Sequence, residues 1–290
     1  MMWSFETKGR IIADVDIAAG SVHLIAGDGP ETVVTVNPAD PASRLDVAAA
    51  GKARVEMTGL RLSVSVPKPG GLMAYVSFRD WGLVDVTVEL PSGSSADIKT
   101  GVGDVRADGE FGEMSAKTGA GEIHVDRAAP ARRLVSGAGR LSLETSSGDT
   151  ELITAGDMEI GLIDGSAHVK NLNGRTRIVE VTGSLRVKSA NGDITVERAG
   201  SDVNARSANG SIVIGELIRG TVSLATAAGA IGIGIAKGTS AWVDAGTKYG
   251  RVRNTLESTA GPETGETVEV RARTSFGDID IRRSSPSENR

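Results

Sequence analysis

Cysteine is absent from the 290-residue sequence, and aromatic residues make up only 3% of it. Without cysteine the chain has no disulfide, no thiolate nucleophile and no sulfur ligand for a metal. It also lacks a run of 18 apolar residues, which excludes a helix that spans a membrane. Charge of one sign is not in excess, with 32 Lys and Arg against 37 Asp and Glu. Because the basic residues are scattered, we expect no nucleic-acid partner.

The N-terminal segment lacks the pattern of a secretory signal, which needs a basic stretch followed by 7–15 apolar residues. Glu6, Lys8 and Arg10 interrupt any such run. We therefore expect a cytoplasmic location and no insertion into a membrane. A surface location would require another export route.

Glycine, by contrast, is abundant: the sequence holds 38 glycines, nearly double the usual share of roughly 7%. From residue 103 onward they recur every nine residues, with occasional slips of one, and Pro130 stands in one slot of the pattern. A fixed period of this kind indicates a repeat architecture. The glycines that open the repeats are Gly103, Gly112, Gly121, Gly139, Gly148, Gly156, Gly165, Gly174, Gly183, Gly192, Gly200, Gly210, Gly220 and Gly229.

Each repeat predicts a short strand followed by a turn. Apolar residues stand two and four places after the glycine, as in Ile123 with Val125 and Ile194 with Val196. This period of two places one face of a strand in a core, whereas a helix would need a spacing of three and four. Glycine at a constant turn position indicates a backbone that needs positive φ or has no room for a Cβ atom.

The repeats fit either an antiparallel meander or a solenoid in which two units of nine residues form one coil. We favour the solenoid because the period is regular and the inward residues are small or aliphatic. The residues after alternate glycines also alternate in sign. An in-register ladder of opposite charges would explain this series, which reads Glu122, Arg140, Asp157, Arg175 and Asp193. The predicted class is therefore an all-β, β-helix-like solenoid with atypical strands at both ends.

The aromatic residues gather at the two ends of the repeat, as expected of units that cap an open core. They include Trp3, Phe5 and Phe111 before it and Trp242, Tyr249 and Phe276 after it. We expect one elongated body rather than separable domains. Its parts are an N-terminal β cap region of strands and longer turns at 1–90, the repeat solenoid at 91–255, closing strands at 256–282 and a disordered tail at 283–290.

No motif points to catalysis, a cofactor or a metal. The calcium-binding repeat G-G-x-G-x-D is missing, so we expect no bound calcium. The period of nine also argues against the six-residue repeat of hexapeptide acyltransferases, and uniform turns offer no groove like that of polysaccharide lyases. His23, His124 and His168 each alternate with inward residues, so we interpret them as surface histidines. Spacing alone pairs none of them with a nucleophile or a carboxylate.

The segment PKPGGLMAYVSFRDWGL at 67–83 is unusually rich in large apolar side chains. One interpretation is a cap over the end of the core. The other is a loop that binds a protein partner or a second copy of the chain. The candidate contact residues are Leu72, Met73, Tyr75, Phe78 and Trp81.

Three motifs resemble a known bacterial family: GTKYGRVRN at 246–254, TSFGDIDI at 274–281 and SANGDI at 189–194. The opening F-E-T-x-G-x-I-x-A-x-V-D-I-A-A-G-S-V adds to this. The chain is similar to the putative-adhesin domain family with β-strand repeats, a domain of unknown function common in actinobacteria, over most of residues 5–282. The family defines no catalytic residues, so none is implied here.

These observations together favour a non-enzymatic scaffold or protein-interaction module whose partner is unknown. The family name implies an alternative, a cell-surface or envelope-associated adhesin. A third possibility is self-assembly into filaments through open β-edges.

Overall fold

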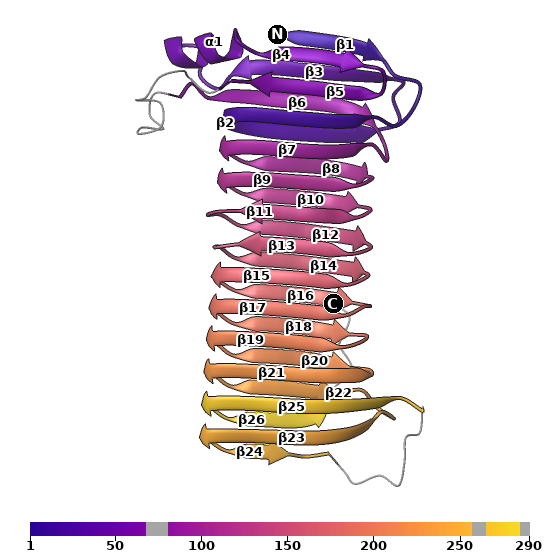
Figure 1. Ribbon diagram of the computed structural model, residues 1–290, viewed down its shortest axis with the longest axis vertical. Helices are drawn as coiled ribbons and strands as arrows, with labels where there is room; N and C mark the ends of the chain where they lie inside the picture. Colours follow the sequence, from indigo (N-terminus) through magenta and orange to yellow (C-terminus); the bar gives the residue numbers. More distant parts are fainter. Residues whose placement is uncertain (68–80, 257–264, 285–290) are drawn as a thin grey trace. The chain divides into compact units, whose positions relative to one another are not determined.

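The computed structural model describes residues 1–67, 81–256 and 265–284. The chain divides into two compact units, Met1–Glu144 (unit 1) and Thr145–Arg290 (unit 2). In each unit, short strands wind into stacked coils whose two sides form sheets A and B (Figure 1). The predicted all-β solenoid is therefore confirmed. One strand, β12 (Leu141–Ser147), carries the boundary between the two units.

Unit 1 begins with antiparallel strands and continues with parallel coils. In sheet A the strand order is β1–β3–β6–β2–β8–β10, and in sheet B it is β4–β5–β2–β7–β9–β11. The sheet A strands other than β2 are β1 (Met2–Glu6), β3 (Glu31–Pro38), β6 (Val84–Pro91), β8 (Val105–Phe111) and β10 (Ile123–Ala128). Those of sheet B are β4 (Arg54–Thr58), β5 (Arg61–Val66), β7 (Ser95–Val102), β9 (Met114–Ala120) and β11 (Ala131–Ser136).

Strand β2 (Ile12–Gly27) belongs to both sheets of unit 1. Its first half lies between β5 and β7 in sheet B, and its second half lies between β6 and β8 in sheet A. The chain turns the corner at Gly20, whose φ of 129° favours glycine. The first coil of the chain is thus inserted between coils that follow it in the sequence.

A short helix, α1 (Arg44–Ala50), interrupts the strands of unit 1. Ser43 caps it by accepting a hydrogen bond from the backbone N–H of Asp46 at 3.3 Å. The buried Asp46 carboxylate in turn accepts hydrogen bonds from the N–H groups of Asp40 and Leu83, each at 3.1 Å. The sequence pattern predicts only strands and turns at 1–90, and this prediction is wrong for residues 44–50, because a helix of two turns shows too little periodicity to be recognised.

Unit 2 consists of parallel strands. The order in sheet B is β13–β15–β17–β19–β21–β25–β23, and in sheet A it is β14–β16–β18–β20–β22–β26–β24. The sheet B strands are β13 (Thr150–Thr154), β15 (Ala167–Asn173), β17 (Leu185–Asn191), β19 (Val203–Asn209), β21 (Gly220–Ala228), β23 (Ser240–Tyr249) and β25 (Thr267–Phe276). Those of sheet A are β14 (Met158–Asp164), β16 (Thr176–Val181), β18 (Ile194–Ala199), β20 (Ile212–Leu217), β22 (Ile231–Ile235), β24 (Val252–Asn254) and β26 (Ile279–Arg283).

The register confirms that two nine-residue repeats form one coil. Leu185 pairs with Val203, and Ile194 pairs with Ile212, so each partner is 18 residues further along the chain. The apolar residues of the period-two pattern face inward and are buried between the sheets, as are Ile194 and Val196. Each buried aliphatic residue therefore stacks on its counterpart in the next coil.

Gly192 shows that a repeated glycine can be required for both predicted reasons. At Gly192 the backbone has a φ of 115°, which residues other than glycine rarely adopt. A Cβ atom at this position would also collide with the carbonyl oxygen of Gly174, one coil away. We call the repeated glycines that stack from coil to coil the glycine column. This column is a line of close backbone contacts between coils.

The acidic residue after the glycine has a role that charge alternation did not reveal. The Asp193 carboxylate accepts a hydrogen bond from the backbone N–H of Ser211 at 2.7 Å, and Asp157 accepts one from the N–H of Arg175 at 2.8 Å. The predicted ladder of charges is represented by the ion pair between Arg175 and Asp157 at 3.6 Å. These carboxylates therefore connect neighbouring coils mainly through the backbone.

The last coil of unit 2 is not the last one in the sequence. Strands β25 and β26 lie between the coil of β21 and β22 and the coil of β23 and β24. Residues 240–254 therefore form the outermost coil of this unit, with β23 and β24 as its terminal strands. Among the described residues, the helices offer no stretch long and apolar enough to cross a lipid bilayer.

Two aromatic residues of unit 1 are buried, whereas the aromatic residues of unit 2 are exposed. In unit 1 Phe111 is fully buried and Trp81 nearly so. In unit 2, Trp242 and Phe276 are each 58% exposed and Tyr249 is 66% exposed. The expectation that these three residues close the core is wrong. They stand at an outward position and at strand ends, while aliphatic residues such as Val270 and Ile279 fill the interior.

Candidate functional site

The predicted partner-binding loop lies mostly outside the described residues, which exclude Leu72, Met73, Tyr75 and Phe78. Trp81 is described, and it packs in unit 1 against Ala18 and Ala19 at the corner of β2. Its buried position suits a packing role. Binding of a partner by this loop stays a prediction.

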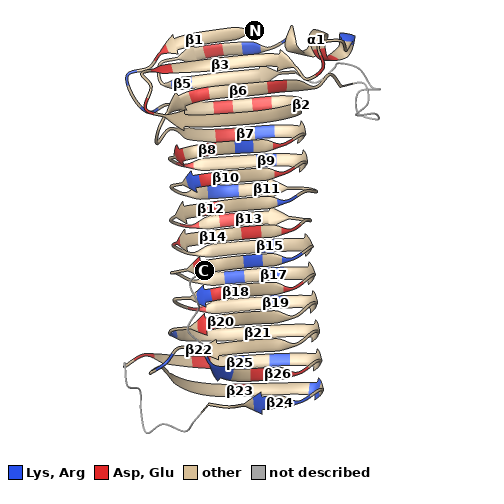
Figure 2. Cartoon of the chain, turned by 180° about the vertical axis from the view of Figure 1, so that it is seen from behind, with Lys and Arg blue, Asp and Glu red and all other residues tan. Residues whose placement is uncertain are grey.

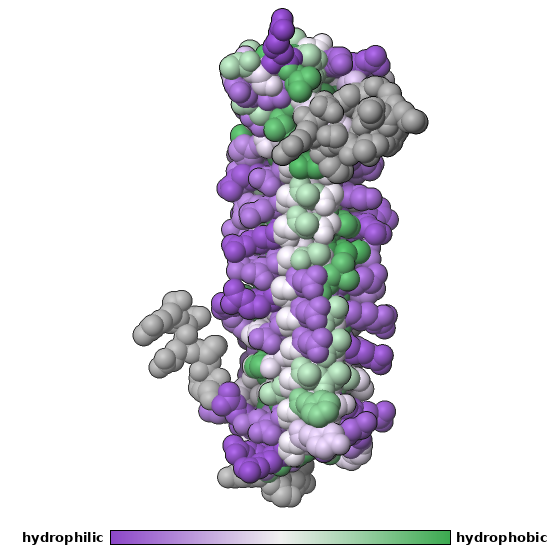
Figure 3. Space-filling view, turned by 90° about the vertical axis from the view of Figure 1, so that its left-hand side faces the viewer, coloured by the Kyte–Doolittle hydropathy of each residue, from purple (hydrophilic) through white to green (hydrophobic). Residues whose placement is uncertain are grey.

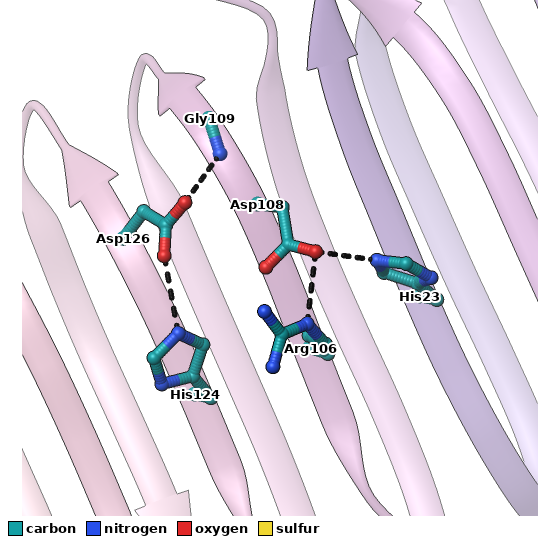
Figure 4. A network of polar contacts seen from close by, with 6 residues as sticks. All are labelled: His23, Arg106, Asp108, Gly109, His124 and Asp126. Atoms are coloured by element: carbon teal, nitrogen blue, oxygen red, sulfur yellow. Dashed lines mark hydrogen bonds and ion pairs between the residues drawn. The ribbon is translucent and has the colours of Figure 1, made fainter.

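The outward face of sheet A in unit 1 carries a network of histidines and carboxylates (Figure 4). Strands β2, β8 and β10 place His23, Arg106 and His124 in one row across the sheet. Two residues further along β8 and β10 stand Asp108 and Asp126. The network therefore joins three neighbouring strands that lie far apart in the sequence.

Each histidine of this network meets a carboxylate. His23 Nε2 lies 2.8 Å from Asp108 Oδ2, and His124 Nε2 lies 3.1 Å from Asp126 Oδ1. Arg106 Nε also donates to Asp108 Oδ2 at 2.8 Å, and the Gly109 N–H donates to Asp126 Oδ2 at 2.9 Å. All four acidic and imidazole side chains are thereby fixed in orientation on an outward face.

The electrostatics of the network keep Asp108 ionised. Burial of its carboxyl group raises the pKa of Asp108. Hydrogen bonds from Arg106 and His23, together with their charges, outweigh burial and hold that pKa below its ordinary value. The carboxylate is therefore negative at neutral pH.

Asp108, His124 and Asp126 form a compact set of possible metal ligands. One ligand atom from each lies within 4.8 Å of the others. Asp108 Oδ1 is buried and has no hydrogen-bond partner among the described residues. Spacing in the sequence could not find this set, because it depends on the coil register and on a bulge between Val125 and Arg127.

His168 has a different environment, on β15 of sheet B in unit 2. Burial and then the charge of Lys170 lower its pKa; Glu151 opposes this shift, and Arg186 and Lys188 add smaller contributions that lower the pKa further. Its Nε2 is buried without a hydrogen-bond partner among the described residues. His168 is therefore a neutral, half-buried side chain near neutral pH.

The outermost coil of unit 2 exposes a second candidate site. Tyr249 at the end of β23 is in register with Phe276 at the end of β25. Their rings stack with centroids 4.9 Å apart and an angle of 9° between their planes. Trp242 lies on the same strand as Tyr249. We refer to Trp242, Tyr249 and Phe276 as the aromatic edge.

A shallow groove runs beside Trp242. It is lined by side chains of β23 and β25, with an ion pair between Arg271 and Glu269 at 2.8 Å on its wall. A second ion pair joins Arg273 to Asp244 at 2.6 Å on the same two strands. The aromatic edge therefore combines exposed rings with fixed charges of both signs. The residues that line the groove are Ser240, Ala241, Trp242, Thr267, Val268, Glu269 and Arg271.

The stacked rings continue a column that runs along the turns of unit 2. Asn191 Nδ2 donates to Asn173 Oδ1, and Asn209 Nδ2 donates to Asn191 Oδ1, each at 2.9 Å. Ala228, Phe276 and Tyr249 follow in register beyond Asn209. Figure 3 faces these strand ends and shows a narrow strip of pale and green residues, interrupted by hydrophilic ones, between hydrophilic sheet faces. The coil spacing thus presents side chains at regular intervals.

The sheet faces themselves mix charges of both signs. Figure 2 shows Lys and Arg interleaved with Asp and Glu along the strands of each unit. One row in unit 2 holds Glu180, Arg198 and Glu216, with Arg198 between the two carboxylates at 3.8 and 3.7 Å. Such exposed pairs contribute little stability each, but they leave the outward faces strongly polar.

The fold and these surfaces define a β-solenoid that displays outward side chains at the spacing of its coils. A sequence match to the Toastrack DUF4097 family covers residues 15–282. The chain therefore belongs to this family, which confirms the resemblance to a domain of unknown function. The actinobacterial type stays a prediction. No curated protein matches the sequence.

Several solved structures resemble the chain over nearly its whole length. A putative adhesin from Bacteroides fragilis is 12% identical, covers 97% of this chain and 96% of its own, and has a TM-score of 0.40. A putative adhesin from Parabacteroides distasonis has the same identity and coverage with a TM-score of 0.36. A putative lipid binding protein from the same organism is 9% identical, with the same coverage and a TM-score of 0.35.

Proposed function

We propose that this protein is a non-enzymatic interaction module that contacts a protein partner through the aromatic edge of unit 2. The observation that carries this proposal is the exposure of Trp242 and Tyr249 on the outermost coil and of Phe276 on the coil next to it. A folded chain leaves large rings in water only at a cost, and aromatic residues are enriched at the centres of protein interfaces. The edge therefore suits a partner with an apolar contact surface.

The rigid structure around the aromatic edge favours binding of a partner there. The Tyr249 ring is held by its stack on Phe276 and by the register of β23 on β25. A ring that is already ordered loses little conformational entropy when it is bound. The ion pairs Arg273–Asp244 and Arg271–Glu269 add a polar rim of the kind that surrounds interface cores.

A scaffold role is further supported by the repetition within unit 2. Each coil repeats the one before it at the strand spacing of about 4.8 Å. The Asn173, Asn191 and Asn209 side chains occupy equivalent places and bond to one another. Such a surface offers binding side chains at fixed spacing.

Site-specific photo-crosslinking in the native cell tests the contact surface. A benzophenone amino acid at position 249 is expected to give a discrete crosslinked adduct with another macromolecule. The matched control carries the same group at position 213, where Val213 is 40% exposed on β20. Equal adducts from both positions, or none from position 249, would refute the proposed surface.

The location of the protein decides between the two forms of this function. We infer an intracellular scaffold, whereas the adhesin alternative needs the aromatic edge to face the outside of the cell. Treatment of intact cells with a protease, followed by detection of the chain, separates them. A protected chain supports the scaffold, and a chain degraded on intact cells supports the adhesin.

Catalysis would contradict either form. We expect the purified protein to show no turnover that a point variant removes. A substrate-dependent reaction lost in such a variant while the fold is retained would overturn the proposal.

A further inference from the structure

We propose that Asp108, His124 and Asp126 in unit 1 bind a divalent transition-metal ion, with Zn²⁺ as its representative. The inference differs from the expectation that the sequence holds no metal site, and it is independent of the aromatic edge. It rests on the geometry of side chains from β8 and β10 (Figure 4).

The distances between the ligand atoms are close to those that a metal requires. In a tetrahedral site with bonds of about 2.1 Å, two ligand atoms lie about 3.4 Å apart. His124 Nε2 and Asp126 Oδ1 are already 3.1 Å apart, and all three ligand atoms lie within 4.8 Å of one another. Small rotations of these half-buried side chains suffice to close the set.

The Asp108 carboxylate has one oxygen left for a metal. Its Oδ2 accepts hydrogen bonds from His23 and Arg106, whereas Oδ1 is buried and has no partner among the described residues. A buried oxygen without a partner costs free energy that a bound cation would recover. The bond from His23 fixes this carboxylate from the far side, as the outer hydrogen bonds of metal ligands commonly do.

The donor set favours a transition metal over calcium. Calcium prefers six to eight oxygen ligands, and this set offers only two carboxylates and one imidazole. Imidazole nitrogen with carboxylate oxygen is typical of zinc and its neighbours. Three protein ligands leave a position for water, and the ion would join two neighbouring coils.

Arg106 sets the affinity of this site. Its guanidinium forms an ion pair with Asp108 Oδ2 at 2.8 Å. A divalent cation must compete with this positive charge. Removal of the arginine should therefore tighten metal binding, whereas removal of a ligand should weaken it.

Calorimetric titration of the full metal-free chain with Zn²⁺ tests the proposal. We expect one Zn²⁺ ion per chain and a rise of the melting temperature on binding. His124→Gln and Asp126→Asn should each weaken binding by about tenfold or more, and Arg106→Gln should tighten it several-fold. Calcium should not displace the bound ion.

The matched control is His168→Gln, which removes a half-buried histidine of unit 2 and should leave Zn²⁺ binding unchanged. Co²⁺ gives a second measurement, because four-coordinate Co²⁺ absorbs visible light strongly. This absorption should appear in the wild-type chain and disappear in His124→Gln. Absence of Zn²⁺ binding, or equal weakening by His168→Gln and His124→Gln, would overturn the site.

Discussion

The lack of a Cβ atom is the reason that glycine occupies turns of the coils. Gly192 combines a φ of 115° with a position where a Cβ atom would meet the carbonyl oxygen of Gly174. Some glycines outside the column carry neither the φ constraint nor the steric constraint. Gly232 on β22 would place a Cβ atom 3.6 Å from the nearest atom of Val213, an ordinary contact. Replacement of a glycine in the column should therefore cost more folding stability than replacement of a glycine outside it.

Gly192→Ala should lower the free energy of unfolding by about 2 kcal/mol or more, because the backbone is strained and the coils must separate. Gly232→Ala is the control and should change it by less than about 0.5 kcal/mol. Urea denaturation of both variants measures the difference. Equal stability of the two variants would show that the glycine column is not under steric constraint.

The histidines of unit 1 show that the position of a residue in the sheet also determines its contact partners. His23 and His124 alternate with buried neighbours, as expected of outward positions. Asp126 stands two residues from His124 on the same strand. Asp108 could not be assigned to His23 from spacing, because strand register decides which outward residues of different strands meet.

At the scale of the element, the turn between two strands is connected to the next coil by an acidic side chain. Asp157 and Asp193 each accept a backbone N–H from the residue 18 places further on. Asp278 does the same for the N–H of Arg251 on the terminal coil at 2.9 Å. The charge of the residue after the glycine therefore matters less than its ability to accept a hydrogen bond.

Asp193→Ala should lower the free energy of unfolding by about 1 kcal/mol, because the N–H of Ser211 loses its partner. Asp193→Asn keeps an acceptor oxygen and should retain most of the stability. Thermal denaturation at neutral pH compares the two variants. A loss as large in Asp193→Asn as in Asp193→Ala would indicate a role for charge rather than for the hydrogen bond.

At the scale of the whole molecule, both units follow one rule of construction and depart from it at one end. Two nine-residue repeats make a coil, and equivalent residues lie 18 apart. In unit 1, β2 is inserted between later coils, and in unit 2, β25 and β26 are inserted before the outermost coil. The end coils are thereby held by pairing on segments that are distant in the sequence.

Deletion of one whole coil from unit 2 tests this rule. Removal of residues 184–201 joins Gly183 to Asp202. Asp202 is the register equivalent of Ser184 in the next coil, so it takes the place of Ser184 and the chain should still fold cooperatively.

Removal of residues 184–192 joins Gly183 to Asp193 and leaves the unit half a coil short, so later strands would fall on the wrong sheet. We expect this chain to lose its cooperative unfolding transition. Circular dichroism with thermal melting distinguishes the two deletions, and equal behaviour of both would contradict the coil of two repeats.

The sequence by itself determined the local geometry and the class of fold. Period-two apolar residues such as Ile194 and Val196 required strands with one buried face, and glycine every nine residues fixed the turns. These properties are local, because they depend on the conformation of a residue and its nearest neighbours along the chain.

Only the tertiary structure decided which distant residues meet. It placed Asp108 beside His23, inserted β25 beside β23, and left the rings of Tyr249 and Phe276 stacked in water rather than inside a cap. Each of these contacts depends on strand register and on the order of coils. A shift of one residue turns a strand's side chains to the other face, so no pattern within a single repeat contains them.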